Sequence, residues 1–169
     1  MTPDPARLPI ETEFLFRVVI QTDRSRIRKL EATPWGTAMD VAVAGGTVTG
    51  PKINGVLLNI GADWGLVTRQ GEGAALDVTD LDCRVIIETD DSPACLIEMR
   101  YAGVGFNHPG VAERPAMDGV RDAGGYYFRT TPRFRTAAPK YDFLNRVVAV
   151  ASGYHRVAAG PIYDVYAVL

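Results

Sequence analysis

The sequence predicts an all-β protein: a single antiparallel β-barrel of the calycin or lipocalin type, with at most one or two short helical turns. Apolar and polar residues alternate in about eight to ten short segments, which is the pattern of half-buried strands. Gly, Pro, Asp and Asn separate these segments as turn signals, and helical periodicity is nearly absent. Strands that follow one another without crossover helices favour an antiparallel sandwich or a closed barrel over a parallel sheet. A barrel of about eight strands can enclose one small ligand.

The first segment shows the alternation most clearly, because Phe14, Phe16 and Val18 share one face and Arg17 lies on the other. Further segments of this kind lie at residues 39–43, 56–66, 83–89, 95–101, 126–128, 147–150 and 162–168. Only residues 139–146 could form a helical turn, where proline suits the first position. The segment 107–125 is rich in glycine and is expected to be a long loop, which would be either a lid or plain disorder.

Size and composition limit the classes of function. At 169 residues the chain is expected to form one domain, at residues 13–169, after a flexible tail at residues 1–12. A net charge of −2 offers no field that would attract nucleic acid or an anionic membrane. No apolar run approaches the ~20 residues of a membrane helix. The first residues lack the order of a signal peptide, so the expected location is the cytoplasm, and a homo-oligomer stays open.

The cysteines and histidines predict neither a metal site nor a cofactor. Cys83 and Cys95 could pair if they lie on adjacent strands, but a protein of the cytosol more often keeps both reduced. His108 and His155 lie far apart, without the spacing of metal ligands. The sequence contains no phosphate-binding glycine loop and no nucleophilic Ser-His-Asp or Cys-His arrangement.

Several motifs occur in the same order as in one known family. They are Gly50-Pro51-Lys52-Ile53-Asn54-Gly55, Gly61-Ala62-Asp63-Trp64, and the segments 84–91, 126–132, 141–145 and 163–166. Through these motifs the chain resembles the DUF3237 proteins, also called the UPF0311 family, from about Trp35 onward. The resemblance implies a small calycin-like β-barrel. It implies little about chemistry, since the family is defined by sequence rather than by a shared reaction.

The chain departs from the family pattern at two places. It has Asp91-Ser92-Pro93 where relatives tend to have an Asp-Gly turn. It has Phe134-Arg135-Thr136 where they tend to have Phe-Glu-Thr, which reverses a charge. A role of that acidic position in relatives therefore does not carry over to this chain.

Asp63 is the first candidate for a catalytic group. Beside Trp64 in a glycine-flanked segment, its carboxyl group could be poorly hydrated, and desolvation raises a carboxyl pKa towards the range useful for proton transfer. The alternative is a turn aspartate that binds backbone amides. Arg84 alternates with apolar residues and could point into the barrel, where it would need an anionic ligand or a carboxylate partner, which could be Asp63, Asp90 or Asp91. The alternative is an outward arginine on a solvated face.

The remaining candidates would bind a substrate. Arg129 presents the same choice as Arg84, whereas Tyr141 and Asn145 would share one face of a helical turn. Tyrosines at a barrel mouth can stack on a flat ligand, and asparagine can orient a carbonyl group. The expected catalytic set is Asp63, Arg84 and Asp91, and the expected binding set is Asn54, Trp64, Tyr101, Phe128, Arg129, Tyr141 and Asn145. Asn54, Asp63 and Trp64 are expected to line the same cavity as Tyr141 and Asn145.

Two functions of different classes fit these residues. The first is a cofactor-free enzyme, an isomerase, dehydratase or cyclase that acts by acid/base proton transfer on a small apolar carbonyl or phenolic compound. The second is a lipocalin-like carrier that binds such a compound without changing it. An enzyme needs a carboxyl group and an oxyanion donor that converge on one cavity wall, whereas a carrier needs only apolar lining. The polar residues favour the enzyme.

Overall fold

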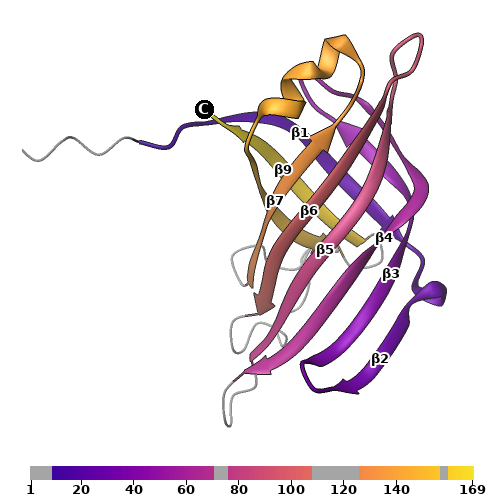
Figure 1. Ribbon diagram of the computed structural model, residues 1–169, viewed down its shortest axis with the longest axis vertical. Helices are drawn as coiled ribbons and strands as arrows, with labels where there is room; N and C mark the ends of the chain where they lie inside the picture. The colour runs from indigo at the N-terminus through magenta and orange to yellow at the C-terminus, as the bar shows by residue number, and fades with distance from the viewer. Residues whose placement is uncertain (1–8, 71–75, 108–125, 157–159) are drawn as a thin grey trace, which may run out of the picture.

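The computed structural model describes residues 9–70, 76–107, 126–156 and 160–169, which form one antiparallel sheet of nine strands (Figure 1). The strands are β1 (Thr12–Thr22), β2 (Arg28–Thr33), β3 (Gly36–Thr49), β4 (Gly55–Gln70), β5 (Leu76–Thr89), β6 (Leu96–Asn107), β7 (Tyr126–Arg135), β8 (Ala149–Arg156) and β9 (Gly160–Val168). Their order in the sheet is β1-β9-β8-β7-β6-β5-β4-β3-β2, so from β2 to β9 each strand pairs with the next one in the sequence.

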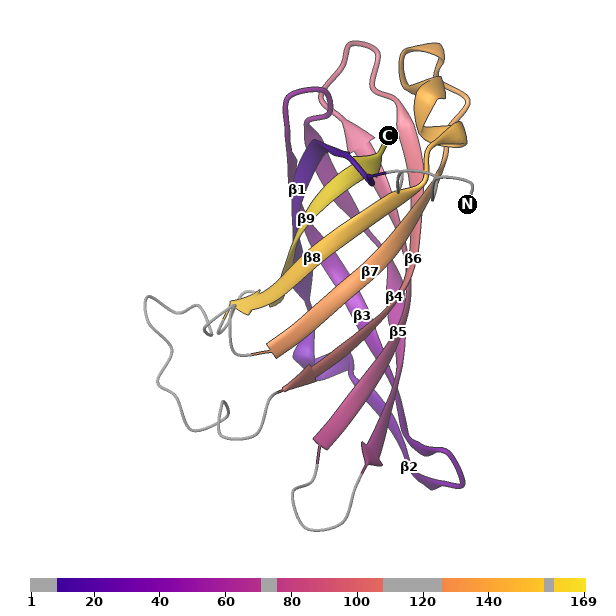
Figure 2. The same cartoon turned by 90° about the vertical axis from the view of Figure 1, so that its left-hand side faces the viewer.

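The sheet closes into a barrel because β1 is paired on both sides. It pairs with β9 along one edge and with β3 along the other. Across the seam with β9, the Arg17 guanidinium donates two hydrogen bonds to the Asp164 carboxylate, at 2.6 and 2.8 Å. Eight strands form the closed wall, and β2 pairs only with β3, in a hairpin that extends beyond it (Figure 2). The antiparallel barrel predicted from the alternation is confirmed.

Two short 3-10 helices connect the strands, η1 (Arg24–Arg26) and η2 (Pro139–Arg146). Proline stands at the start of η2, as the sequence predicts, and Tyr141 and Leu144 are buried beneath the helix. η2 lies at one end of the barrel and the β2 hairpin at the other (Figure 2). These are called the η2 end and the β2 end below.

The core fills the half of the barrel at the η2 end. Interior side chains there are almost fully buried: Ile87 and Ile97 are 0% exposed, and Phe134 is 5% exposed. The rings of Phe16 and Phe134 meet edge to face, with centroids 5.9 Å apart. The next residue along β7, Arg135, is exposed, as the alternation requires.

Gly61 sets the register of β4. Its φ of 109° lies in the left-handed region, and an added Cβ would lie 2.0 Å from the carbonyl oxygen of Arg84. Glycine therefore permits the irregular stretch of β4 between Leu57 and Gly61. Beyond that stretch, Asp63 pairs with Cys83 on β5.

Parts of the predicted organisation lie outside the described residues. The predicted loop at 107–125 falls almost wholly on residues 108–125, and most of the predicted tail falls on residues 1–8. β1 begins at Thr12. Within the described ranges, no helix has the length and apolar character needed to cross a membrane.

Candidate functional site

Asp63 faces the interior of the barrel. Direct cross-strand pairs link it to Val41 on β3 and to Cys83 on β5, and Cys83 pairs in turn with Tyr101 on β6. Directly paired residues lie on the same face of a sheet, and Cys83 and Tyr101 are 0% and 2% exposed. Asp63, Cys83 and Tyr101 therefore form one polar row across the inner wall.

The Asp63 carboxyl group is partly buried and accepts a hydrogen bond from the backbone N–H of Asp82, at 3.1 Å. Burial raises the pKa of Asp63 from 3.8 to about 6; the hydrogen bond opposes this shift and the charge of Asp82 adds to it. Every Lys and Arg side chain that the structure describes is exposed, and none of them forms an ion pair with Asp63. The group can therefore accept or release a proton near neutral pH.

The other two members of the row are neutral. The Tyr101 hydroxyl donates a hydrogen bond to the Cys83 sulfur. Burial raises the pKa of Cys83 to about 12, and burial raises the pKa of Tyr101 well above its usual value. At neutral pH both groups therefore keep their protons, and Asp63 lies beside a neutral thiol and a neutral hydroxyl. Cys83 and Cys95 are both free thiols, so the alternative of a disulfide is not realised.

Aromatic rings continue from this row towards the β2 end. The centroids of Tyr101 and Tyr163 are 5.1 Å apart, as are those of Tyr163 and Phe128. The His155 ring stacks on Phe128 at 5.0 Å, with 12° between the planes. An added Cβ at Gly153 would lie 2.6 Å from the Phe128 ring and 2.8 Å from the Tyr163 ring. The missing side chain therefore lets both rings rest directly against β8.

The interior is accessible to solvent next to the polar row. Met39, Val41, Leu81 and Gly103 belong to the inner face by their pairing, yet all are only half-buried. The corresponding inner residues at the η2 end are almost fully buried. Solvent therefore reaches the inner face next to Asp63 more readily than it reaches the η2 end.

One inner hydroxyl lacks a partner. Thr130 pairs with Gly103 on the inner face and is 3% exposed. Its Oγ1 is buried with no hydrogen-bond partner among the described residues. Leaving a buried hydroxyl unpaired is unfavourable, so a ligand oxygen placed there would gain a hydrogen bond.

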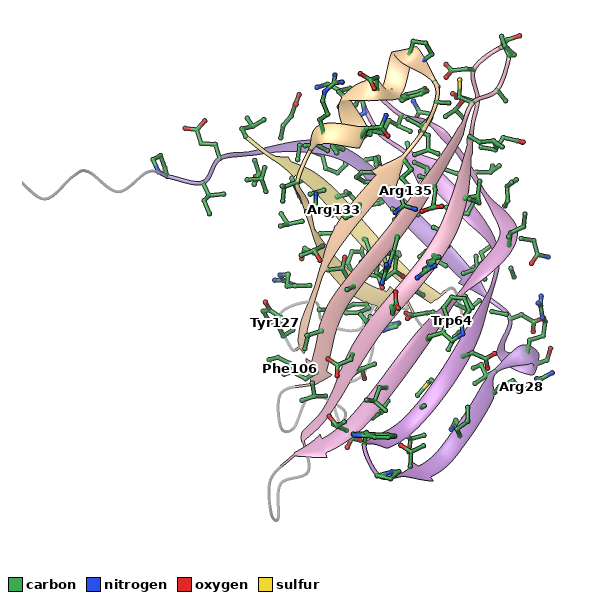
Figure 3. The ribbon with its side chains drawn as sticks, viewed as in Figure 1. Arg28, Trp64, Phe106, Tyr127, Arg133 and Arg135 are labelled. Carbon is green, nitrogen blue, oxygen red and sulfur yellow. The ribbon has the colours of Figure 1, made fainter. Side chains whose placement is uncertain are left out.

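Of the predicted site residues, Asp63, Tyr101 and Phe128 lie inside the barrel, whereas Trp64 does not. Trp64 follows Asp63 on β4 and so faces the opposite side of the wall, where it is 53% exposed (Figure 3). The expectation that Trp64 shares a cavity with Asp63 is corrected on this ground. Successive residues of a strand cannot both face the interior.

The two predicted arginines also lie outside. Arg84 lies between the inward-facing residues Cys83 and Val85 and is exposed. This agrees with the alternative of an outward arginine on a solvated face. Arg129 is exposed on β7, where it donates a hydrogen bond to the Phe128 carbonyl oxygen at 2.9 Å. Neither guanidinium faces Asp63, so neither can stabilise an oxyanion beside it.

Asn54 and Asn145 hold turns together. The Asn54 side chain accepts a hydrogen bond from the backbone N–H of Gly50 and donates one to its carbonyl oxygen, both at 3.1 Å. Asn145 does the same with Thr136, at 2.9 Å for each bond. Both amide groups are thus engaged by the backbone rather than turned to the interior.

Asp91 binds η2 to the turn between β5 and β6. It accepts hydrogen bonds from the Tyr141 hydroxyl at 2.6 Å and from the Lys140 ammonium at 2.5 Å. The hydrogen bonds from Lys140 and Tyr141 lower the pKa of Asp91. The common cavity expected for Asn54, Asp63, Trp64, Tyr141 and Asn145 is therefore not formed, and the correction rests on these local partners.

The inner site also contains residues that the sequence did not mark. Cys83 and Thr130 could have been placed on the inner face by the alternation alone. No comparable signal exists for Tyr163 and His155, because β8 and β9 reach Phe128 and Tyr101 only through the closed sheet. Within the described ranges, no three His, Cys, Asp or Glu residues are grouped so as to hold a metal ion.

Comparison of the chain with known proteins places it in one protein family. The family described as "Protein of unknown function (DUF3237)" matches residues 10–168. A UPF0311 protein of Rhodopseudomonas palustris (strain TIE-1) is 26% identical over 160 residues, which cover 95% of this chain and 97% of that protein. A β-barrel-like protein from Acinetobacter baumannii AYE has a similar crystal structure, with a TM-score of 0.78 and 29% identity over 98% of this chain and 100% of that one. An enzyme from Penicillium herquei shares the fold, with a TM-score of 0.65 and 15% identity over 98% of this chain and 99% of that one. These matches confirm what the motifs indicate: the chain belongs to the DUF3237 family.

Proposed function

We propose that the chain is an enzyme of the isomerase, dehydratase or cyclase type, which transfers protons on a small neutral carbonyl or phenolic compound inside the barrel. One observation carries the proposal. Asp63 is a carboxyl group on the inner wall with no ion-pair partner among the described residues, beside neutral donors and aromatic rings. A carboxylate with a purely structural role more commonly forms an ion pair or is exposed to solvent.

The chemistry follows from the groups around Asp63. As a carboxylate, it removes a proton from a carbon next to a carbonyl group or from a phenolic hydroxyl, and the negative charge moves to the substrate oxygen. The Thr130 hydroxyl, and that of Tyr101 if it leaves Cys83, are the neutral donors that would stabilise this oxyanion. Asp63 then returns the proton to another carbon or to a leaving oxygen. The substrate is neither oxidised nor reduced in this reaction, so the proposal includes no redox cofactor.

The lining favours a neutral, flat substrate. Every described Lys and Arg side chain is exposed, so the described part of the interior offers no cation to an anionic substrate. The interior next to the polar row is aromatic, since the ring centroids of Phe128 and Tyr163 lie 5.1 Å apart there. Aromatic rings of this kind stack on planar ligands. The enzyme from Penicillium herquei shows that an enzyme can have this fold, and at 15% identity it supports nothing finer.

The proposal can be tested by measuring hydrogen–deuterium exchange on small ketones and phenols. Aryl ketones and phenols are incubated with the protein in D2O, and NMR measures both binding and the incorporation of deuterium at carbon. Wild-type protein should exchange faster as the pH rises through about 6, where Asp63 ionises. The variant Asp63→Asn should lose ~10²–10⁴-fold in rate with nearly unchanged binding, because the amide keeps the size of the side chain. Asp80→Asn, an exposed aspartate on β5, is the matched control and should keep the wild-type rate.

A non-catalytic carrier is the second candidate, which the aromatic lining of Phe128, Tyr163 and Tyr101 favours. A carrier would bind the same probes without exchanging their protons. Binding that is equal in wild type and Asp63→Asn, with no exchange in either, would replace the enzyme by the carrier. Exchange that is as fast in Asp63→Asn as in wild type would exclude Asp63 as the proton-transfer group.

A further inference from the structure

A furrow runs along the outer wall over β6 and β7 and changes in chemistry along its length. One part is a mainly apolar groove of about 940 Å³ that reaches from β5 to β9. Val104, Tyr127, Val150 and Tyr166 line it, together with the charged residues Asp80 and Arg129. The other part is a pocket of about 260 Å³ lined by Glu98 and by the arginines at positions 100, 133 and 135. Ala102 and Thr131 line both parts, so the two are continuous. Together they are called the β6–β7 furrow.

The apolar part is exposed to solvent in the monomer. Val104, Tyr127 and Val150 are 36%, 42% and 37% exposed. The rings of Phe106 and Tyr127 stack with centroids 5.1 Å apart near the β2 end of the barrel (Figure 3). The floor consists of the small side chains of Ala102 and Thr131. Contiguous exposed apolar side chains of this kind are characteristic of binding surfaces.

A row of three arginines crosses the outer wall at the charged part, and two of them, Arg100 and Arg133, line it. Arg84 pairs directly with Arg100 across β5 and β6, and Arg100 pairs directly with Arg133 across β6 and β7. Like charges directly opposite each other destabilise a sheet. Asp82 accepts a hydrogen bond from Arg100 at 3.3 Å. No carboxylate among the described residues forms an ion pair with Arg84 or Arg133. The row therefore keeps positive charge that an anion would neutralise.

We propose that the β6–β7 furrow binds a free anionic amphiphile, a long-chain carboxylate of the fatty-acid class. Its carboxylate would lie at Arg100 and Arg133, because guanidinium groups bind carboxylates with paired hydrogen bonds. Its hydrocarbon chain would lie in the apolar groove, past Thr131 towards Tyr127. Arg133 and Tyr127 are six positions apart on β7, which at ~3.3 Å per position is about 20 Å, a length that a long acyl chain spans.

The surroundings favour a single carboxylate over an anionic membrane. Asp80 lines the far side of the groove, and Asp82 and Glu98 border the arginines. Several acidic side chains at the rim would repel a surface that carries many negative charges. The mainly apolar groove of about 940 Å³ lies within the range of ~300–1,000 Å³ that is typical of a site for one small molecule.

The test measures the affinity for palmitate by calorimetry. Arg133→Gln removes one charged donor and should weaken palmitate binding by ~10-fold or more. Thr131→Trp fills the floor of the furrow and should abolish it. Arg28→Gln, which removes the same charge from the exposed face of β2, is the matched control and should bind as wild type does (Figure 3). The uncharged methyl ester of palmitate should bind wild-type protein no better than palmitate binds Arg133→Gln.

Several results would overturn this proposal. One is the absence of palmitate binding, and another is an equal loss in Arg133→Gln and Arg28→Gln. Binding that survives both Arg133→Gln and Thr131→Trp would place the ligand elsewhere, such as inside the barrel. Binding to phosphatidylglycerol vesicles without binding to free palmitate would make the furrow a membrane contact. A stable dimer that Val150→Asp dissociates would make it an interface between two copies.

Circular dichroism checks that each variant folds. If Thr131→Trp does not fold, the comparison of Arg133→Gln with Arg28→Gln decides whether palmitate binds in the furrow.

Discussion

Replacing Asp63 with asparagine should make the barrel more stable at neutral pH. Burial raises the pKa of Asp63 from 3.8 to about 6, so the native state binds this proton more tightly than the unfolded chain does. Stability therefore falls as the pH rises from about 4 to about 6, and above that range the full cost of a buried carboxylate is present. Asparagine carries no charge, and its Oδ1 can still accept the hydrogen bond from the Asp82 N–H.

The magnitude follows from the size of the shift. About two pKa units at ~1.36 kcal/mol per unit give ~3 kcal/mol, which is an upper limit because solvent reaches part of the group. In a protein of this size ~1 kcal/mol corresponds to a change of ~2–4 °C in Tm. Asp63→Asn should thus raise the Tm at pH 8 by up to ~10 °C. Near pH 4 the two proteins should unfold at nearly the same temperature.

Urea unfolding of both proteins between pH 4 and pH 8 measures this difference directly, with Asp80→Asn as a control for the change in net charge. A gain that appears between pH 4 and pH 6 and then stays constant is the expected result. Asp63→Asn that is less stable than wild type at pH 8 would refute the reasoning. It would show instead that the ionised carboxylate of Asp63 stabilises the backbone at Asp82, as a turn aspartate does.

Two further predictions concern the inner wall. Gly153→Ala places a methyl group 2.6 Å from the Phe128 ring, so it should lower the free energy of unfolding by ~1–3 kcal/mol. Gly105→Ala, whose nearest atom is 3.1 Å away, should cost less, and equal effects of the two changes on urea unfolding would contradict this packing. Cys83 is 0% exposed and has a pKa raised to about 12, so iodoacetamide at pH 8 should modify at most Cys95 in the folded protein. Peptide mapping by mass spectrometry reads the labelled positions, and rapid native labelling of Cys83 would be incompatible with its burial.

The wall of the barrel could be predicted from the sequence because strand alternation is a local property. Strand alternation also predicts the direction of the Trp64 side chain, since a residue next to an inward-facing Asp63 must face outward. Asp63 and Trp64 belong to the same sequence motif, but the two-residue period of the strand places them on opposite faces of the wall. Arg84 follows the same rule, and its outward alternative is the one that the structure contains.

The remaining errors concern partners that no local pattern identifies. Tyr141 forms its hydrogen bond with Asp91, 50 residues away, and Asn145 with Thr136 across a turn. Tyr163 reaches Tyr101 only because the sheet is closed, which brings β9 towards β6 across the interior. Interior contacts of a barrel depend on its curvature and register. Neither quantity can be read from one segment.

The double pairing of β1 has a consequence for the order of events in folding. β1 is synthesised well before its partner β9, since Arg17 and Asp164 are 147 residues apart. Contacts of such large sequence separation form slowly, because the ends of a long segment must first meet. Until β9 arrives, β1 has one open edge, and open edges pair readily with other chains. The protection against aggregation that a closed barrel provides is therefore complete only when β9 has docked on β1.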